Sequence, residues 1–407
     1  MMNNVPPMPL EEAQARLLAL VEPLPMEHVD VEGAIGRYLA EAVQARRTHP
    51  SADLSAMDGY AVTDANLSGP WRVVGESAAG HPFSGTVGPG EAVRISTGAV
   101  LPAGAKAVIL QEDVACANQQ VTLTGEAPEP FHKHIRACGL DFCQGDEVMA
   151  AGIRIGPAQA ALAIAAGHKH LPVSRRPRVA VIDSGDELVR DPETCQPHQI
   201  PASNGAMLMT MAHALPVEAE RVGPVIDTTE ALIGAFETVP MADVIVTSGG
   251  ASVGDHDLVR PALEAWGATL DFWRVGIKPG KPILVASRAC GTGRQLIVGL
   301  PGNPVSSFVT GYHFLLPLLR KLLGARDPLP LRFPARLGVP LRAHGGRREF
   351  LRASWDGHRV VPQATQDSGA LAALAASNVL IDRPAFAPAA AEGEEVLVYL
   401  LQNGGIA

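Results

Sequence analysis

Apolar runs alternate with helical segments between residues 176 and 324, and this alternation constrains the fold more than any other feature of the chain. The runs include residues 179–182, 244–247 and 296–298, and each is followed by a turn rich in glycine or polar residues. Such alternation predicts a mainly parallel sheet covered by helices on both faces, which is a three-layer α/β domain. In open sheets of this kind, ligands bind beyond the carboxyl ends of the strands.

The chain is too long for one hydrophobic core. Its 407 residues exceed the roughly 250 to 300 residues over which a single core grows. We predict a multidomain α/β protein whose first domain is discontinuous (1–47 and 145–175), with its two helices, at 10–21 and 157–166, packed together. Short β-type runs predict an inserted small β domain at 48–144, the α/β domain spans 176–326, and a C-terminal β domain follows at 327–407.

Composition excludes several classes of protein. The formal net charge of -9 argues against a nucleic-acid surface. Apolar runs stay short of the roughly 18 residues that a membrane span needs, and the first residues lack a signal-peptide pattern, so we expect a cytoplasmic protein without a membrane segment. The 5 cysteines form no CxxC pair, which argues against a disulfide framework or a four-ligand zinc site. Cys138 and Cys143 are expected to be buried or idle thiols.

The apolar run at 244–247 continues into a glycine-rich turn that ends in two aspartates. Glycines let a ligand approach the backbone, hydroxyl groups donate hydrogen bonds, and carboxylates bind Mg²⁺ or accept a proton. These groups are Ser248, Gly249, Gly250, Ser252, Gly254, Asp255 and Asp257. The segment is typical of a phosphate-binding loop beside catalytic carboxylates. A glycine-rich connection with two solvated aspartates explains the same sequence.

Three other strand ends carry polar residues suited to the same crevice. At 184–187 we expect a strand-to-helix junction whose N–H groups and helix dipole favour phosphate; its residues are Ser184, Gly185, Asp186 and Glu187. The simpler interpretation is that acids in a first helical turn need no ligand. A Pro-Gly turn carries Lys278 and Lys281, and a turn with Pro301 precedes Asn303, which is expected to cap the following helix. Asp227 is equally typical of a helix cap and of a ligand.

Seven segments occur in an order that resembles one protein family. They are 55–61 (SAMDGYA), 94–99 (RISTGA), 184–188 (SGDEL), 248–257 (SGGASVGDHD), 278–282 (KPGKP), 299–306 (GLPGNPVS) and 346–352 (GRREFLR). Together they resemble the molybdopterin molybdenumtransferase (MoeA) family, to which the E domain of gephyrin is similar, along the whole chain. Ala202 and Leu140 depart from the family pattern, which puts the contribution of their two loops in doubt and not the family.

The resemblance implies an enzyme that ligates molybdate to adenylylated molybdopterin with Mg²⁺ and releases AMP. It implies an elongated N-terminal domain, a molybdopterin-binding α/β domain and a barrel-like C-terminal domain. Lys278, Lys281 and an arginine, Arg348 or Arg352, are then partners for the oxyanion. Asp257 is the first choice for the acid, and Glu187 and Asp227 place the metal or the nucleotide, with all three as candidate metal ligands.

The resemblance also implies a homodimer with an active site shared between subunits. Asp58 would be catalytic and Thr97 a polar contact, both acting on the partner's α/β domain. Candidate protein partners are the molybdopterin adenylyltransferase and molybdoenzyme chaperones. Two rival functions stay open: adenylylation of molybdopterin, because the α/β domain resembles that of the preceding enzyme, and a non-catalytic scaffold. The sequence does not distinguish molybdate from tungstate.

Overall fold

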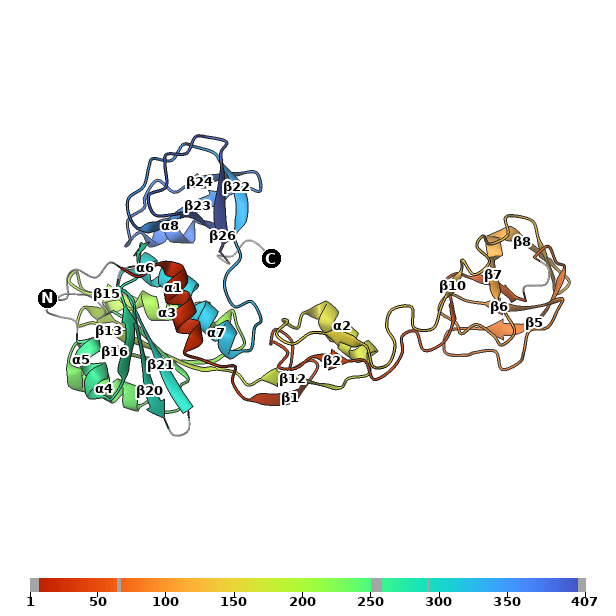
Figure 1. Cartoon of the computed structure of the whole chain (residues 1–407), viewed down its shortest axis with the longest axis horizontal. Coiled ribbons are helices and arrows are strands. Elements are labelled where there is room, and N and C mark those ends of the chain that lie inside the picture. The colour runs from red at the N-terminus through yellow and green to blue at the C-terminus, as the bar shows by residue number, and fades with distance from the viewer. Residues whose placement is uncertain (1–6, 64–66, 250–257, 281, 291–292, 402–407) are drawn as a thin grey trace.

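The computed structural model describes residues 7–63, 67–249, 258–280, 282–290 and 293–401. The molecule is elongated: the α/β and C-terminal domains lie together at one end, the N-terminal domain follows, and the inserted β domain lies at the far end (Figure 1). The predicted multidomain α/β fold is confirmed, while the exact domain boundaries stay predictions. None of the described helices has the length and apolarity to cross a membrane.

The sheet of the α/β domain has the strand order β16-β13-β17-β21-β20-β18. Its first four strands run parallel, and β20 and β18 are antiparallel additions at one edge. The strands are β13 (Arg178–Ser184), β16 (Glu218–Val225), β17 (Val244–Ser248), β18 (Thr269–Trp273), β20 (Leu284–Cys290) and β21 (Gly293–Leu300). The prediction of a mainly parallel sheet is therefore confirmed, with an antiparallel edge that the alternation pattern did not reveal.

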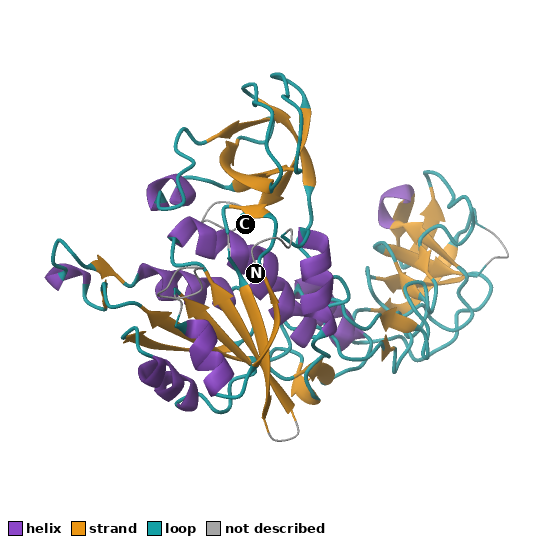
Figure 2. Cartoon of the chain, turned by 60° about the vertical axis from the view of Figure 1, so that its left-hand side comes forward, coloured by secondary structure: helices purple, strands orange, loops and turns teal. Residues whose placement is uncertain are grey.

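Alternate residues of the central strands enter two separate cores, so the sheet is covered on both faces (Figure 2). Val179 and Val181 pack against one layer of helices, whereas Ala180 and Ile182 pack against the other. The first layer holds α1 (Leu10–Ala19), α3 (Ser203–His213), α6 (Pro304–Thr310), the π-helical turn η3 (Gly311–Leu315) and α7 (Leu316–Leu322), and the second holds α4 (Thr229–Glu237) and α5 (Val259–Ala265). An apolar run without alternation is what two covered faces require.

The N-terminal helix α1 packs on the α/β domain. Leu10, Ala13 and Leu17 enter the core that contains α7, whereas Ala163 of α2 (Pro157–Ala165) belongs to a different core. The predicted pairing of these two helices is therefore wrong. An amphipathic pattern specifies that a helix buries one face, but it does not specify which surface covers that face.

The N-terminal domain is built on short strand pairs beside α2. β1 (Met26–Asp30) pairs with β12 (His170–Ser174), and β2 (Val43–Gln44) pairs with β11 (Glu147–Met149), both antiparallel. The inserted β domain has a sheet with the order β7-β4-β6-β5-β9-β8. Its elements are β3 (Leu54–Ser55), β4 (Gly59–Val62), β5 (Trp71–Ser77), β6 (Glu91–Ile95), β7 (Ala107–Leu110), η1 (Gln111–Asp113), β8 (Val114–Ala117), β9 (Gln120–Leu123) and β10 (Ile135–Arg136).

Five strands of the C-terminal domain close into a barrel, as the fold class predicts. The order β23-β24-β22-β26-β25 is closed by pairing of β25 with β23, and β19 (Ile277–Lys278) from the α/β domain adds itself beside β23. The elements are β22 (Phe333–Leu337), β23 (Arg348–Trp355), β24 (Arg359–Pro362), α8 (Leu371–Ala375), β25 (Val379–Arg383) and β26 (Glu395–Leu400). β19 thus ties the barrel to the sheet edge where ligands are expected.

The cysteines differ from expectation in one respect. Cys138 and Cys143 are exposed, as is Cys116, so of the two predicted alternatives this pair is not buried, and idle thiols stay a prediction. Both lie in the loop that returns from the inserted β domain, where backbone hydrogen bonds to His49 and Pro50 leave the side chains at the surface.

Candidate functional site

A cavity of about 420 Å³ lies at the carboxyl ends of β13 and β17, the sheet edge at which the sequence predicts a ligand. One side is a short arm formed by β14 (Leu188–Val189), η2 (Pro192–Thr194) and β15 (Ile200–Pro201). The lining residues are Asp183, Ser184, Glu187, Leu188, Ile200, Pro201, Ala202, Ser203, Asn204, Ser248, Gly249, Gly302, Pro304, Gly369 and Leu371. Because Gly369 and Leu371 come from the C-terminal domain, two domains form this site.

The cavity floor is polar and tightly built. Ser184 and Ser248 are buried at the ends of adjacent strands, and the hydroxyl of Ser184 makes no hydrogen bond within the described part of the chain. Gly249 has a φ of 103°, and a Cβ there would lie 2.6 Å from the carbonyl oxygen of Ser184. Only glycine suits this position. The structure therefore brings Ser184, Ser248 and Gly249 together as predicted, with a hydroxyl donor left for a ligand.

Asp183 is a cavity residue that the sequence interpretation missed. Its side chain is buried, and its Oδ2 accepts a hydrogen bond from Arg221 Nε at 2.7 Å. Burial raises the pKa of Asp183, although hydrogen bonds from Arg221 and from the backbone of Gly205 oppose the shift. The only sequence signal was a charged residue inside an apolar run, immediately before Ser184.

Three carboxylates, Asp186, Glu187 and Asp227, follow the ends of the neighbouring strands β13 and β16. The backbone N–H of Asp227 donates to Asp186 Oδ1 at 3.0 Å. Glu187 folds back over Gly185, where an added Cβ would lie 2.7 Å from Glu187 Oε2. Glu187 lines the cavity, but within the described residues no group of three His, Cys, Asp or Glu side chains is arranged to hold a metal ion.

Local chemistry at three predicted positions differs from expectation. Residues 184–187 do not form a strand-to-helix junction, because the chain first makes the arm of β14, η2 and β15, and α3 begins only at Ser203. The N-cap of α4 is Thr228, whose Oγ1 accepts from Ala231 N at 3.2 Å, so the cap role predicted for Asp227 is wrong. Asn303 is the N-cap of α6 but makes no side-chain cap hydrogen bond.

The turn before α6 is instead held by another side chain. Asn204 Nδ2 donates to the carbonyl oxygen of Gly302 at 2.7 Å. This bond joins the start of α3 to the turn that contains Pro301, which is buried. Pro301 therefore shapes the cavity wall through the backbone of the next residue.

The predicted cations occupy three different settings. Lys278 Nζ lies 2.7 Å from Glu349 Oε1 and is half exposed. Arg348 donates from Nε to Asp382 Oδ1 at 2.6 Å and also pairs with Glu11 of α1, so it joins two domains. Arg352 is fully buried; its Nη2 donates to the carbonyl oxygens of Thr365 at 3.2 Å and Asp367 at 3.1 Å.

Arg352 lies behind the loop that brings Gly369 to the cavity. Its Nε and Nη1 have no partner within the described residues, and burial lowers its pKa. The loop is in turn joined to the cavity wall, because Val305 N of α6 donates to the carbonyl oxygen of Ser368 at 3.0 Å. Of the two predicted arginines, Arg352 is thus connected to the cavity, whereas Arg348 is taken up by acidic partners.

Asp58 and Thr97 form a separate polar group in the inserted β domain. Asp58 Oδ1 accepts from Thr97 N at 2.6 Å and from Thr97 Oγ1 at 3.0 Å. These hydrogen bonds lower the pKa of the exposed Asp58 carboxyl. The inserted β domain lies at the opposite end of the molecule from the cavity, so the chain does not bring this pair to it (Figure 1).

Five other predicted residues lie outside the described part of the chain. They are Gly250, Ser252, Gly254, Asp257 and Lys281, and Asp255, of the same segment as Asp257, lies outside it as well.

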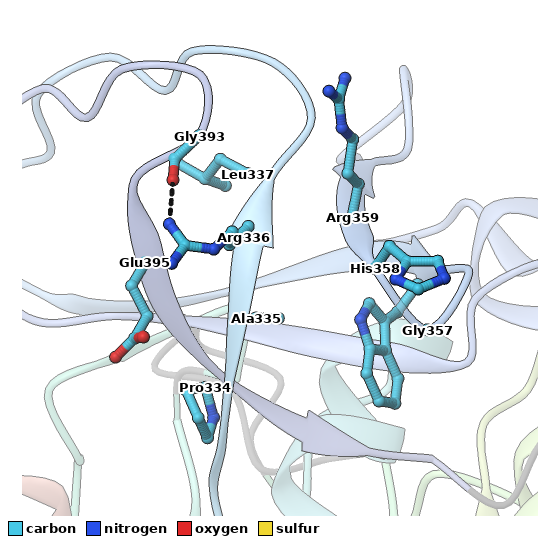
Figure 3. A pocket seen from close by; sticks show the side chains of 10 residues that line it. Pro334, Ala335, Arg336, Leu337, Gly357, His358, Arg359, Gly393 and Glu395 are labelled. Atoms are coloured by element: carbon cyan, nitrogen blue, oxygen red, sulfur yellow. Dashed lines mark hydrogen bonds between the residues drawn. The ribbon is translucent and has the colours of Figure 1, made fainter.

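A second cavity, of about 460 Å³, lies on the C-terminal barrel and contains none of the predicted residues. Figure 3 shows Arg336, His358 and Arg359 among the residues that line it. Arg336 Nη1 donates to the carbonyl oxygen of Gly393 at 3.2 Å, and Arg359 pairs with Glu392 at 3.2 Å. Because its arginines have partners and none of the predicted residues lines it, this cavity is the weaker candidate.

Three family descriptions match the chain in order. Residues 8–167 match the MoeA N-terminal region (domain I and II), residues 180–321 match a probable molybdopterin binding domain, and residues 334–401 match the MoeA C-terminal region (domain IV). The chain is 36% identical over 349 residues to a molybdopterin molybdenumtransferase of Haemophilus influenzae, covering 84% of this chain and 85% of the relative. It is 35% identical over 390 residues to one of Nostoc sp., covering 92% and 88%.

Solved structures agree with this assignment. A molybdopterin biosynthesis MoeA protein from Pyrococcus horikoshii is 31% identical with a TM-score of 0.79, covering 98% of this chain and 100% of that one. A second structure from the same organism is 26% identical with a TM-score of 0.83, covering 97% and 100%. Because the order of domains, the identity and the fold agree over almost the whole length, this chain belongs to the MoeA family.

Proposed function

We propose that this chain is a molybdenum insertase, a transferase of molybdenum cofactor biosynthesis that ligates molybdate to adenylylated molybdopterin and releases AMP. The observation that carries the proposal is the two-domain cavity, in which buried serines and the Gly249 backbone lie beside the carboxylates of Asp183 and Glu187. The relatives named molybdopterin molybdenumtransferase support the same activity. Such a site holds a phosphate and an oxyanion together.

The residues divide the anionic groups of the substrates among them. Ser184 suits a phosphate or the pterin's polar edge, because its buried hydroxyl makes no hydrogen bond within the described part of the chain, and Gly249 beside it has no side chain to block the approach of the ligand. Leu188 and Ile200 of the arm give the same cavity an apolar side for a planar ring. Lys278 of β19 provides charge for molybdate, with the buried Arg352 as a more distant cation, and Lys281 stays a predicted partner of the oxyanion.

A divalent cation suits the carboxylates at this edge. Glu187 and Asp227 supply hard oxygen atoms, and Mg²⁺ commonly binds one or two carboxylates and completes its shell with water and substrate phosphate. When bound, Mg²⁺ supplies charge neutralisation at the pyrophosphate that is cleaved. Asp257 completes the proposed set as proton donor or as a third ligand, since replacing oxo groups by thiolates consumes protons.

The exposed Asp58–Thr97 pair supports a homodimer with composite sites. A carboxylate held ionised by two hydrogen bonds at the far end of the chain does nothing for the cavity of its own subunit. Placed over the cavity of a partner, it would complete the acidic set. The cytoplasmic location, the adenylyltransferase and the molybdoenzyme chaperones as partners stay predictions.

The rival activity, adenylylation of molybdopterin, is disfavoured because the matched N-terminal and C-terminal MoeA regions flank the molybdopterin-binding domain. A direct test supplies adenylylated molybdopterin and Mg²⁺ and measures AMP release with molybdate, with tungstate and with neither. We expect release to require an oxyanion. The Asp257→Asn variant should retain substrate binding but lose turnover by about two powers of ten. ATP-dependent adenylylation of molybdopterin, or binding without turnover in the unaltered chain, would overturn the proposal.

A further inference from the structure

Lys278 is held by a carboxylate from another domain. β19 and β23 are parallel neighbours in register, with Lys278 opposite Glu349, so the backbones fix both residues. Lys278 Nζ and Glu349 Oε1 are 2.7 Å apart, and Glu349 is only 13% exposed whereas Lys278 is 50% exposed. An ammonium group has three donors, so Lys278 keeps donors for a ligand while one is directed to Glu349.

The second oxygen of Glu349 is occupied by a histidine. His344 Nδ1 lies 2.9 Å from Glu349 Oε2, and His344 Nε2 lies 2.5 Å from the carbonyl oxygen of Arg347. Both neighbours are acceptors, and a neutral imidazole has only one N–H to donate. The doubly protonated ring satisfies both contacts. The backbone holds the ring in place, because His344 N donates to the carbonyl oxygen of Ala387 at 2.9 Å.

Within the described part of the chain, the other charged groups around Glu349 form no ion pair with it, and most of them have partners of their own. Arg352 is buried on the same strand and is electrostatically linked to Glu349. Arg383 lies opposite Glu349 on β25 and donates to backbone carbonyls of Arg342 and Pro388. Arg348 pairs with Asp382 and Glu11. Besides Lys278, His344 is therefore the side chain among the described residues that directly contacts the Glu349 carboxylate.

We propose that His344 is a positioning residue which, through Glu349, controls the affinity of Lys278 for a dianionic oxyanion. With His344 protonated, Glu349 anchors the Lys278 side chain without presenting net negative charge to the ligand. When His344 is neutral, Lys278 alone balances the Glu349 carboxylate, so less of its positive charge remains for the dianion. Affinity for the oxyanion then falls as pH rises. The inference rests on the proposed role of Lys278 in oxyanion binding.

The test measures binding of molybdate alone to the full-length protein by calorimetry between about pH 6 and pH 8.5, a range in which histidines commonly change charge. For the unaltered chain we expect affinity to fall about tenfold across this range, the scale of one partly screened charge acting on a dianion. His344→Gln should bind weakly at every pH, and His344→Lys should bind tightly at every pH. His358→Gln, an exposed histidine of the same domain, is the matched control and should keep the slope.

Glu349→Gln separates this role from a merely structural one. Removing the carboxylate charge removes the need for a cation at position 344, so the affinity of this variant for molybdate should no longer depend on pH. That affinity should equal or exceed the affinity of the unaltered chain at low pH. The unfolding midpoints of all variants identify any that fail to fold. If His344→Gln fails to fold, the pH dependence of molybdate binding by His344→Lys is compared with that of the unaltered chain instead. An unchanged pH slope in His344→Gln would overturn only this inference and would leave the proposed role of Lys278 standing. Absence of molybdate binding in the unaltered chain at every pH would overturn both the inference and the proposed role of Lys278.

Discussion

The α/β domain and the inserted β domain both carry predicted site residues, but they present them in opposite ways. In the α/β domain the residues line a cavity whose floor includes the fully buried Asp183 and the buried Ser184. In the inserted β domain, Asp58 is exposed and its defined partner is Thr97. A cavity with buried donors resembles a complete binding site, whereas an exposed and oriented carboxylate resembles half of one.

The two regions also differ in how they join the rest of the chain. The α/β domain is joined to the barrel by β19 and by a buried aromatic cluster. In this cluster the ring centroid of His313 lies 4.2 Å from that of Phe350 and 4.8 Å from that of Tyr399. The inserted β domain is joined through a narrow connection in which His49 stacks on Phe142 at 5.5 Å. The comparison teaches that the cavity residues are fixed between two packed domains, whereas Asp58 and Thr97 lie on a domain that is joined to the rest through a narrow connection. A site that unites both regions across two subunits is our proposal.

The largest expected effect is at Asp58. Asp58→Asn should lower AMP release by about two powers of ten or more, the scale of a lost catalytic carboxylate. The unfolding midpoint should move little, because surface substitutions change stability by about 0.5 kcal/mol or less. Turnover measured beside thermal unfolding checks both parts.

A mixing experiment then tests whether Asp58 acts across subunits. Asp58→Asn subunits combined in equal amounts with Glu187→Ala subunits should recover about a quarter of full activity, because half of the dimers would be mixed and each would hold one intact site. If mixed dimers form and activity stays at background, the two regions do not share a site.

Lys278→Ala should raise the oxyanion KM by roughly 10- to 150-fold, which corresponds to the 1.5 to 3 kcal/mol typical of a lost charge-assisted hydrogen bond. Stability should change little, since half of the Lys278 side chain is exposed. Lys169→Ala, at an exposed lysine of the N-terminal domain, is the control. A large fall in the unfolding midpoint with an unaltered KM would assign Lys278 to the domain junction.

His313 tests the fixed join between the α/β domain and the barrel. Burial lowers the pKa of His313 from 6.5 to about 3, with a smaller contribution from Arg348. The unfolded chain binds a proton below pH 6.5 while the folded chain resists it, so stability is full above this value and falls as pH decreases toward 3. At pH 5 the loss should be about 2 kcal/mol. Urea unfolding at pH 7 and pH 5 measures it.

A His313→Phe variant should lose this part of the pH dependence, because phenylalanine does not titrate and can stack in the same cluster. His358→Gln in the exposed turn should leave the dependence unchanged. An equal loss of stability in His313→Phe at pH 5 would show that another group controls the acid sensitivity.

Thr97→Val should have the smallest effect. It removes the Oγ1 donor to Asp58 and leaves the backbone N–H, so the pKa of Asp58 should move part of the way back to its ordinary value. Because the backbone N–H of Thr97 still holds the exposed carboxylate, we expect only a roughly two- to tenfold loss of turnover, most visible at low pH where Asp58 takes up a proton. Thr97→Ser should restore activity. If Ser and Val variants behave alike, the hydroxyl has no part in orienting Asp58.

Local sequence signals predicted the sheet edge and much of its floor. Gly249 was expected at a close approach because a glycine follows an apolar run, and its positive φ confirms that reasoning. The same kind of signal failed at Asp227, since Thr228 is an equally good cap one position later. It failed for α1 as well, because its apolar face fits either the N-terminal domain or the α/β domain until both are assembled.

By itself the sequence determined the alternation of strands and helices, the family, and the glycine and serine positions at the strand ends, because these depend on residues close together in the chain. Only the tertiary structure decided that Asp183 pairs with Arg221, that Arg352 faces inward behind the Gly369 loop, and that Lys278 meets Glu349. The physical reason is that a buried charge needs a partner, and the partner available is whichever group packing brings within hydrogen-bond distance. Tertiary packing makes that choice, within one sheet for Asp183 and Arg221 and between two domains for Lys278 and Glu349, and the local sequence does not specify it.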